Sequence, residues 1–169
     1  MSVSASVGPQ SLPELKAQVE KILAAAKQQG ASACEVAVSV QQGLETSVRQ
    51  GEVETVEFNR DQGFSITVYS GQQKGSASTT VTGDQAIQDT VAAALAIAKH
   101  ASPDEFAGLA DKELMATEFP ELDLYHAWDI SPAEAIELAL ECEAAAFATD
   151  SRISNADGTS VNSDVGCTV

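Results

Sequence analysis

The hydrophobic pattern of this chain changes its period between residues 30 and 34. Before that point the apolar residues follow a helical stripe, which consists of Leu15, Val19, Ile22, Leu23 and Ala26. Gly30 then stands where a helix typically ends. After it the apolar residues alternate with polar ones, at Cys34, Val36, Val38 and Val40. Because alternation with period two indicates a strand with one buried face, the chain is predicted to combine helices and strands in an α+β fold.

Further strands are predicted as far as residue 79. Short runs rich in Val, Thr, Ile, Phe and Tyr are separated by Gly43, Gly51, Gly63, Gly71 and Gly75. This spacing predicts an antiparallel β-sheet meander with hairpin turns. In the run after Gly63, one face should carry Phe64, Ile66 and Val68, and the opposite face Ser65, Thr67 and Tyr69.

About three α-helices should flank this sheet. Ser11 and Glu14 have the spacing of a capping box and predict the start of the first helix. A second helix is expected over about residues 84–99, with Thr82 or Asp84 as its cap and a buried stripe of Ile87, Val91, Leu95 and Ala98. A third should run from a Ser131-Pro132-x-Glu134 capping box to about Ala148. Its apolar residues spread round more than one side, which predicts burial between two surfaces: Ile136, Leu138, Leu140, Cys142 and Phe147.

The remaining segments set the expected domain limits. Residues 1–10 have no periodicity and are predicted to be a flexible tail, so the structured domain should comprise residues 11–169. Residues 103–130 are expected to form a long surface connection. The last segment should be a hairpin that turns at Asp157 and Gly158. Its final strand runs to Val169 without a stop signal, and we therefore expect the domain to be truncated before a C-terminal domain.

The charge is strongly negative, −16 over 169 residues. Residues 104–143 contain twelve Asp or Glu and a single basic residue, Lys112, for a net charge of −11. Direct binding to nucleic acid phosphates is therefore disfavoured, and the acidic part should be either solubilising surface or a contact for a basic partner. No apolar run approaches the roughly 20 residues of a membrane helix. A soluble protein is therefore expected. The three cysteines have no C-x-x-C spacing, so the expected compartment is the reducing cytoplasm.

The stretch "GEVETVEF" places three glutamates in one predicted strand. Glu52 and Glu54 would project from the same side and Glu57 from the other, so the first two could share a site. The same carboxylates are also expected on the solvent face of an antiparallel strand, and protection of a sheet edge by charge is a second ordinary reason to find them. The solvent-face interpretation is the ordinary one, and it is favoured.

No catalytic, cofactor-binding or metal-binding residue is predicted. A zinc protease helix needs two histidines one turn apart, whereas the only histidines are His100 and His126. His126, with Asp123 and Asp129 on either side, is the one candidate, and a surface histidine in an acidic loop is the favoured interpretation. No G-x-S-x-G elbow occurs. Two of the cysteines, Cys34 and Cys142, are expected to be buried and inert.

Three stretches give the chain a resemblance to a known family. They are "RQGEVETVEFNRDQGFSITVYSGQQKGSAST" at residues 49–79, "SPDEFAGLADKELMATEFPELDLYHAWDISPAEAIELA" at residues 102–139, and "RISNADGTSVNSD" at residues 152–164. Together they resemble the TldD/PmbA family, also called the modulator of DNA gyrase family, and in particular its PmbA or TldE branch. Ser65 departs from the family pattern, in which a second glycine is expected before the "ITVY" strand.

The resemblance implies the N-terminal domain of a non-catalytic subunit in a cytoplasmic TldD/TldE-type zinc metalloprotease. The zinc would belong to a TldD-like partner, and the substrates would be unfolded or extended peptides, including peptide-antibiotic precursors and antitoxins. Whether this subunit is itself an enzyme is left open, since the family is one of metalloproteases but no catalytic residue of the family maps onto this chain. The alternative is an acidic regulatory protein that binds a gyrase-type topoisomerase.

Overall fold

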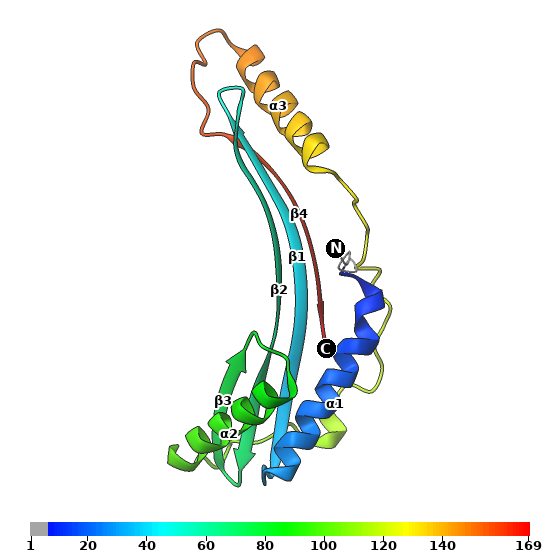
Figure 1. The fold of residues 1–169 in the computed structure, drawn as a ribbon, viewed down its shortest axis with the longest axis vertical. Coiled ribbons are helices and arrows are strands. Elements are labelled where there is room, and N and C mark those ends of the chain that lie inside the picture. Colours follow the sequence, from blue (N-terminus) through cyan, green and yellow to red (C-terminus); the bar gives the residue numbers. More distant parts are fainter. Residues whose placement is uncertain (1–6) are drawn as a thin grey trace. The chain divides into compact units, whose positions relative to one another are not determined.

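A computed structural model describes residues 7–169 of the chain. In chain order the elements are η1 (Pro9–Ser11), α1 (Leu12–Gln28), β1 (Ala33–Arg49), β2 (Glu52–Ser70), β3 (Gln73–Thr79), α2 (Asp84–His100), η2 (Lys112–Leu114), α3 (Pro132–Thr149) and β4 (Thr159–Thr168). The predicted α+β class with three α-helices is confirmed (Figure 1).

The four strands form one sheet in the order β3-β2-β1-β4. β1 and β2 are joined by a two-residue turn, Gln50-Gly51, in which both residues have positive φ (55° and 76°), as a type I′ hairpin requires. β2 and β3 pair antiparallel from Phe64 opposite Thr79 to Ser70 opposite Gln73. The last strand adds to β1, because Val38 and Val169 exchange both backbone hydrogen bonds at 2.9 Å, the pattern of an antiparallel pair.

The strands are longer than the predicted short runs. Gly43, Gly63 and Gly75 lie inside β1, β2 and β3, and only Gly51 and Gly71 stand in turns. Glycine is needed inside a strand where another chain segment approaches closely. A Cβ on Gly43 would collide with the carboxylate of Asp164, and one on Gly75 with the backbone of α2 at Ala94 and Ala98. The prediction of hairpin turns was therefore wrong for Gly43, Gly63 and Gly75.

The chain divides into two compact units, each with its own small core. The two-helix unit comprises Val7–Val40, Asp61–Leu124 and Gly166–Val169, and the hairpin unit comprises Gln41–Arg60 and Tyr125–Val165. In the two-helix unit α2 packs on β3 and also contacts α1. The core of this unit includes the predicted residues of β1, β2 and α2, namely Val38, Val40, Phe64, Ile66, Val68, Ile87, Val91, Leu95 and Ala98. Tyr69, predicted on the face opposite Phe64, is buried as well and donates a hydrogen bond from its hydroxyl to Glu35.

The helix starts follow the predicted signals only in part. Ser11 precedes α1, but its side chain makes no capping bond, because η1 already holds Ser11 in a helical conformation. The cap of α2 is Gly83 rather than Thr82 or Asp84. At the end of α1, Gly30 has φ 93°, and Ala31 donates to the carbonyl of Ala26, as in a Schellman motif.

α3 has the predicted capping box but not the predicted surroundings. The Ser131 hydroxyl accepts from the Glu134 amide, and the Glu134 carboxylate accepts from the Ser131 amide. The helix buries only a narrow stripe of Ala135, Ala139 and Glu143, and Leu138 is 44% exposed. The expectation of burial between two surfaces was wrong, since Leu138 and Cys142 are exposed. The other three residues of that pattern, Ile136, Leu140 and Phe147, are only partly buried.

The predicted long connection is confirmed: residues 101–131 contain only the short η2. The predicted C-terminal hairpin was wrong, because residues 151–158 form no strand and β4 pairs with β1 instead. Residues 1–6 of the predicted tail lie outside the described residues. Within the described part of that tail, Val7 is buried and Pro9 opens η1, so regular structure begins before Ser11. None of the helices in residues 7–169 is long and apolar enough to cross a membrane.

Candidate functional site

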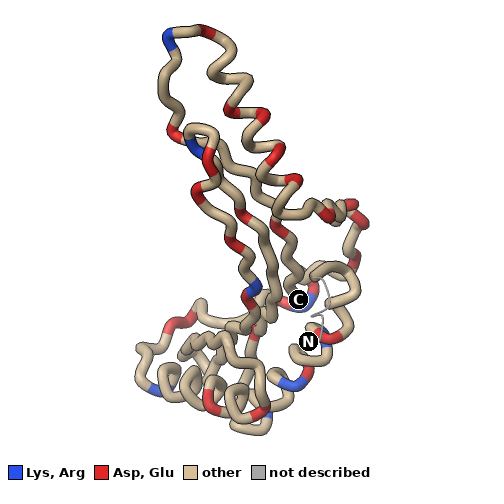
Figure 2. The backbone as a smooth tube through the Cα atoms, turned by 45° about the horizontal axis from the view of Figure 1, so that its top comes forward, with Lys and Arg blue, Asp and Glu red and all other residues tan. Residues whose placement is uncertain are grey.

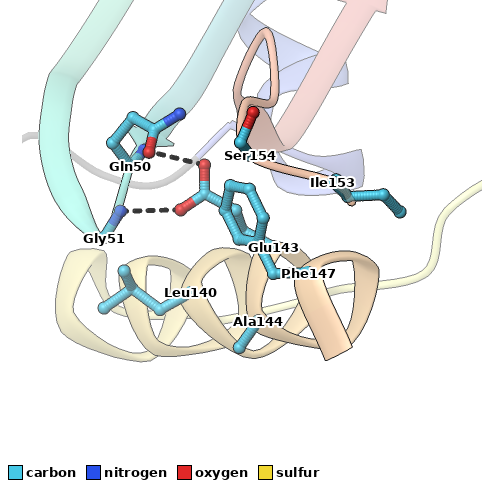
Figure 3. Close-up of a pocket in the computed structure, with 8 residues that line it drawn as sticks. All are labelled: Gln50, Gly51, Leu140, Glu143, Ala144, Phe147, Ile153 and Ser154. Carbon is cyan, nitrogen blue, oxygen red and sulfur yellow. Dashed lines mark hydrogen bonds between the residues drawn. The ribbon is translucent and has the colours of Figure 1, made fainter. Parts of the chain in front are cut away.

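The most organised polar site of the hairpin unit surrounds the Gln50-Gly51 turn. A type I′ turn points its backbone amides outward, so these donors need acceptors from elsewhere in the fold. The acceptor is the carboxylate of Glu143, which lies one helical turn beyond Ala139 on the buried stripe of α3. Its Oε1 accepts from the Gln50 amide at 2.9 Å, and its Oε2 from the Gly51 amide at 2.7 Å (Figure 3).

Glu143 is buried, with 3% of its surface exposed. Burying a carboxylate is costly unless hydrogen bonds replace its hydration. Here each oxygen receives a backbone N–H, and hydrogen bonds to a charged acceptor are about twice as strong as those between neutral groups. The side chain therefore fastens the turn to α3.

A second contact connects the same turn to the segment after α3. The Gln50 side chain donates from Nε2 to Oδ1 of Asn155 at 2.7 Å. That segment begins with a bidentate pair in which Arg152 donates to Asp150, with Nη2 to Oδ2 at 2.7 Å. The Arg152 side chain lowers the pKa of Asp150, mainly through this side-chain hydrogen bond and further through the Arg152 amide. We call Gln50, Gly51, Glu143 and Asn155 the turn clamp.

A pocket of about 550 Å³ adjoins the turn clamp. Its apolar wall consists of Leu140, Ala144, Phe147 and Ile153, and its polar atoms come from the turn, Glu143 and Ser154 (Figure 3). The volume falls in the range of small-molecule or side-chain pockets. Both Glu143 oxygens already accept backbone hydrogen bonds from the turn, and the wall of the pocket is largely apolar, so the pocket is suited to binding an apolar group.

The three glutamates of "GEVETVEF" lie on β2 and are all exposed. Their apolar neighbours are exposed as well, since Val53, Val56 and Phe58 are 48%, 51% and 67% accessible. Solvent therefore reaches both faces of this half of β2, which goes beyond the single solvent face that was predicted. The structure gives Glu52, Glu54 and Glu57 no shared buried site.

The histidines and cysteines that were considered as candidates in the sequence form no metal centre within the described residues. In the part of the chain that the structure describes, no three His, Cys, Asp or Glu side chains are grouped so that they could hold a metal ion. The residues present therefore do not fit the zinc site that a metalloprotease needs. Burial raises the pKa of the Cys34 thiol, as expected of an inert cysteine. Cys142 is exposed, so its predicted burial was wrong.

The sequence offered one signal for the turn clamp that the prediction did not use. Glu143 follows Ala135 and Ala139 at intervals of four, so it continues the small-residue stripe of α3. A charged residue on a buried stripe indicates a specific hydrogen-bonding partner. The identity of that partner could not be read from the sequence, because Gly51 is 92 residues away.

The sheet with its three helices and the clamped hairpin form an α+β module, and this module matches two family models. The family model of PmbA/TldA metallopeptidase domain 1 matches residues 34–98, and that of the PmbA/TldA metallopeptidase central domain matches residues 125–168. The chain belongs to the PmbA/TldD family, as its resemblance predicted.

Two curated relatives give the extent of the match. The Metalloprotease PmbA homolog of Haemophilus influenzae is 51% identical over 156 residues, which cover 92% of this chain and 34% of the relative. Metalloprotease PmbA of Escherichia coli O157:H7 is 54% identical over 147 residues, covering 87% of this chain and 32% of the relative. The chain thus spans about one third of the length of these relatives.

Solved structures show the same fold at low sequence identity. A protein described as a modulator of DNA gyrase, from Bacteroides thetaiotaomicron, aligns with a TM-score of 0.75 at 23% identity, over 92% of this chain and 35% of that one. TldE from Thermococcus kodakarensis aligns with a TM-score of 0.65 at 19% identity, over 89% of this chain and 36% of that one.

Proposed function

We propose that this chain is the N-terminal part of a non-catalytic, PmbA/TldE-like subunit of a cytoplasmic zinc metalloprotease. A TldD-type subunit pairs with it in a heterodimer and holds the zinc. The substrates are unfolded or extended peptides, including peptide-antibiotic precursors and antitoxins. Family membership supports this proposal, and the identities of 51% and 54% to proteins named PmbA support the PmbA-like assignment.

The proposed binding of extended peptides rests on the unpaired edge of β2. β3 pairs with β2 only from Phe64 to Ser70, so within the described chain residues 52–60 have a neighbouring strand only on the β1 side. An extended peptide can add to such an edge through main-chain hydrogen bonds, which give affinity with little sequence preference. Val56 and Phe58 supply exposed apolar surface beside this edge.

A subunit without a metal can still control the rate of cleavage. It does so by holding the peptide in register with the partner's zinc, since misplacing a substrate by about an ångström can cost on the order of a hundredfold in rate. The acids of this strand, Glu52, Glu54 and Glu57, would favour peptides with basic side chains near the pairing segment.

A peptide-cleavage assay tests the proposal on four samples: this chain, its full-length protein, the TldD-type partner, and the full-length pair. We expect cleavage only with the pair, and its loss on addition of a chelator. Chelator-sensitive cleavage by this chain alone would refute the non-catalytic role. A partner that is equally active without the full-length protein would refute the need for the pair.

The β2 edge is tested by a double variant, Val56→Ala with Phe58→Ala, in the full-length protein. Removing this apolar surface should raise the KM for an unfolded peptide several-fold while the pair still forms. The matched control is Val81→Ala with Ile97→Ala, two residues that are similarly exposed but lie in the two-helix unit. Equal KM values for both variants would exclude the edge as a peptide site.

A second candidate is an acidic regulator of a gyrase-type topoisomerase, favoured by the net charge of −11 over residues 104–143. Figure 2 shows acidic residues repeated along α3. A protein of this kind would occupy a basic DNA-binding surface through salt-sensitive contacts. Salt-dependent binding to a topoisomerase, measured beside binding to the TldD-type partner, distinguishes the two functions.

A further inference from the structure

Residues 104–124, which we call the acidic connection, expose an unusual amount of apolar surface. Phe106 is 87% exposed, Phe119 83%, Leu124 82% and Leu114 78%. Leu109, Met115 and Leu122 are exposed as well. A buried aromatic side chain typically removes roughly 150–250 Å² from water, so the two phenylalanines alone offer roughly 300–500 Å². Seven exposed large apolar side chains within 21 residues of one segment indicate an interaction site.

The backbone of the acidic connection is shaped by local hydrogen bonds. The Ala107 amide donates to the Asp104 carbonyl at 2.9 Å, and the Leu114 amide donates to the Asp111 carbonyl at 2.8 Å. Its first residue is anchored to the fold, since the Asp104 amide donates to the Gln72 carbonyl in the β2–β3 turn. The segment thus starts from a fixed point and presents its large side chains outward.

The charge of the acidic connection selects the chemistry of its partner. It contains seven acids and one base, Lys112, for a net charge of −6. An anionic membrane surface or a nucleic acid would repel it. A second copy would bring two segments of the same sign together, which is also unfavourable. The surface that fits is a protein groove with an apolar floor and a rim of Lys and Arg.

We infer that the acidic connection is the docking segment through which this subunit binds such a basic-rimmed apolar groove on the TldD-type subunit. The inference rests on the proposed function, because that function supplies the partner. Standard interfaces bury about 800 Å² on each side, so the phenylalanines and leucines of the segment would contribute a large share. Extended segments of this kind wrap a partner over many contacts.

The test measures the affinity of the full-length protein for the TldD-type subunit by calorimetry at two salt concentrations. The docking variant carries Phe106→Ser, Leu114→Ser and Phe119→Ser. The control variant carries Val81→Ser, Ile97→Ser and Leu138→Ser, three exposed apolar residues outside the segment. We expect the docking variant to weaken binding at least about tenfold, the control to change it less than about threefold, and higher salt to weaken the unsubstituted pair.

Three other outcomes would overturn the inference. Equal affinities of the docking and control variants would remove the segment from the interface and leave the proposed pairing intact. A docking variant that lowers the stability of the isolated full-length subunit, with unchanged pair affinity, would show that the segment is covered within its own chain. A wild-type pair that does not form at all would overturn both this inference and the proposed function.

Discussion

Oε2 of Glu143 accepts a hydrogen bond of 2.7 Å from the Gly51 amide, which lies 92 residues earlier in the chain. A companion bond from the Gln50 amide occupies the other carboxylate oxygen. One side chain of α3 thus satisfies both outward amides of the β1–β2 turn. Because the hairpin unit has few other buried side chains, we expect this contact to contribute strongly to its stability.

The first prediction concerns this contact. Glu143→Ala removes two charge-assisted hydrogen bonds and should lower the free energy of unfolding by about 2–4 kcal/mol. Denaturant titration measures the loss. Glu141→Ala, an exposed glutamate on the same helix, is the control and should change stability by less than about 0.5 kcal/mol. Similar stabilities for the two variants would show that the turn does not depend on Glu143.

The second prediction concerns the close approach of β3 to α2. Gly75→Ala places a methyl group against the backbone of Ala94 and Ala98, which cannot rotate away as a side chain could. The variant should lose at least about 2 kcal/mol in thermal or chemical unfolding. Gly108→Ala, where the added carbon meets nothing within 4 Å, should be within about 0.5 kcal/mol of the parent. A stable Gly75→Ala variant would contradict the packing of α2 on β3.

The third prediction concerns the capping box of α3. The Ser131 hydroxyl and then the Ser131 amide lower the pKa of Glu134. Since the folded pKa lies below the unfolded one, this stabilisation is present above the unfolded value and is lost as the pH falls through the folded value. Ser131→Ala should cost about 1 kcal/mol of stability at neutral pH.

The same variant should also return the Glu134 pKa toward its ordinary value, as followed by NMR titration of the carboxyl group. The stability difference between parent and variant should shrink in acid. An unchanged Glu134 pKa in the variant would mean that the capping box is not the cause of the shift.

The fourth prediction concerns metal content. The purified, tag-free chain should contain no stoichiometric zinc, because its histidines and cysteines are not grouped as ligands within the described residues. Elemental analysis after dialysis against trace zinc is the measurement. About one tightly held zinc ion per chain would contradict the absence of a site.

The fifth prediction concerns the exposed glutamates of β2. Replacing Glu52 and Glu54 together with Gln should leave the fold intact and change the free energy of unfolding by less than about 1 kcal/mol. Both side chains are exposed and lie outside the turn clamp. A loss of several kcal/mol in denaturant titration would show that they belong to a buried network after all.

Local sequence patterns predicted the helices and strands well, but they predicted the tertiary contacts of these elements less well. Ile87, Val91, Leu95 and Ala98 are buried as their spacing indicates, and the Ser131 capping box forms. The errors arise where a distant segment decides the outcome. Gly43 lies inside a strand because Asp164 faces it from β4, and no local pattern contains that contact.

The candidate site illustrates the same limit. Gly51 indicated a hairpin turn at Gln50 and Gly51. Their acceptor Glu143 lies on a helix for which the local pattern predicted burial between two surfaces but no specific partner. Two of the three stretches on which the family resemblance rested, residues 49–79 and 152–164, meet at the bond between Gln50 and Asn155.

The position of β4 beside β1 has a consequence for how the chain is made. β1 is complete after residue 49, but its second neighbour starts at Thr159, so one side of β1 stays open while residues 50–158 are synthesised. Pairing over such a sequence distance forms slowly, and open strand edges on a nascent chain are prone to mispairing. The Asp164 carboxylate opposite Gly43 then helps to fix the register of β4 on β1. Gly43 is the only position of β1 that has no Cβ, so a shift of β4 by one residue would place a different side chain against it.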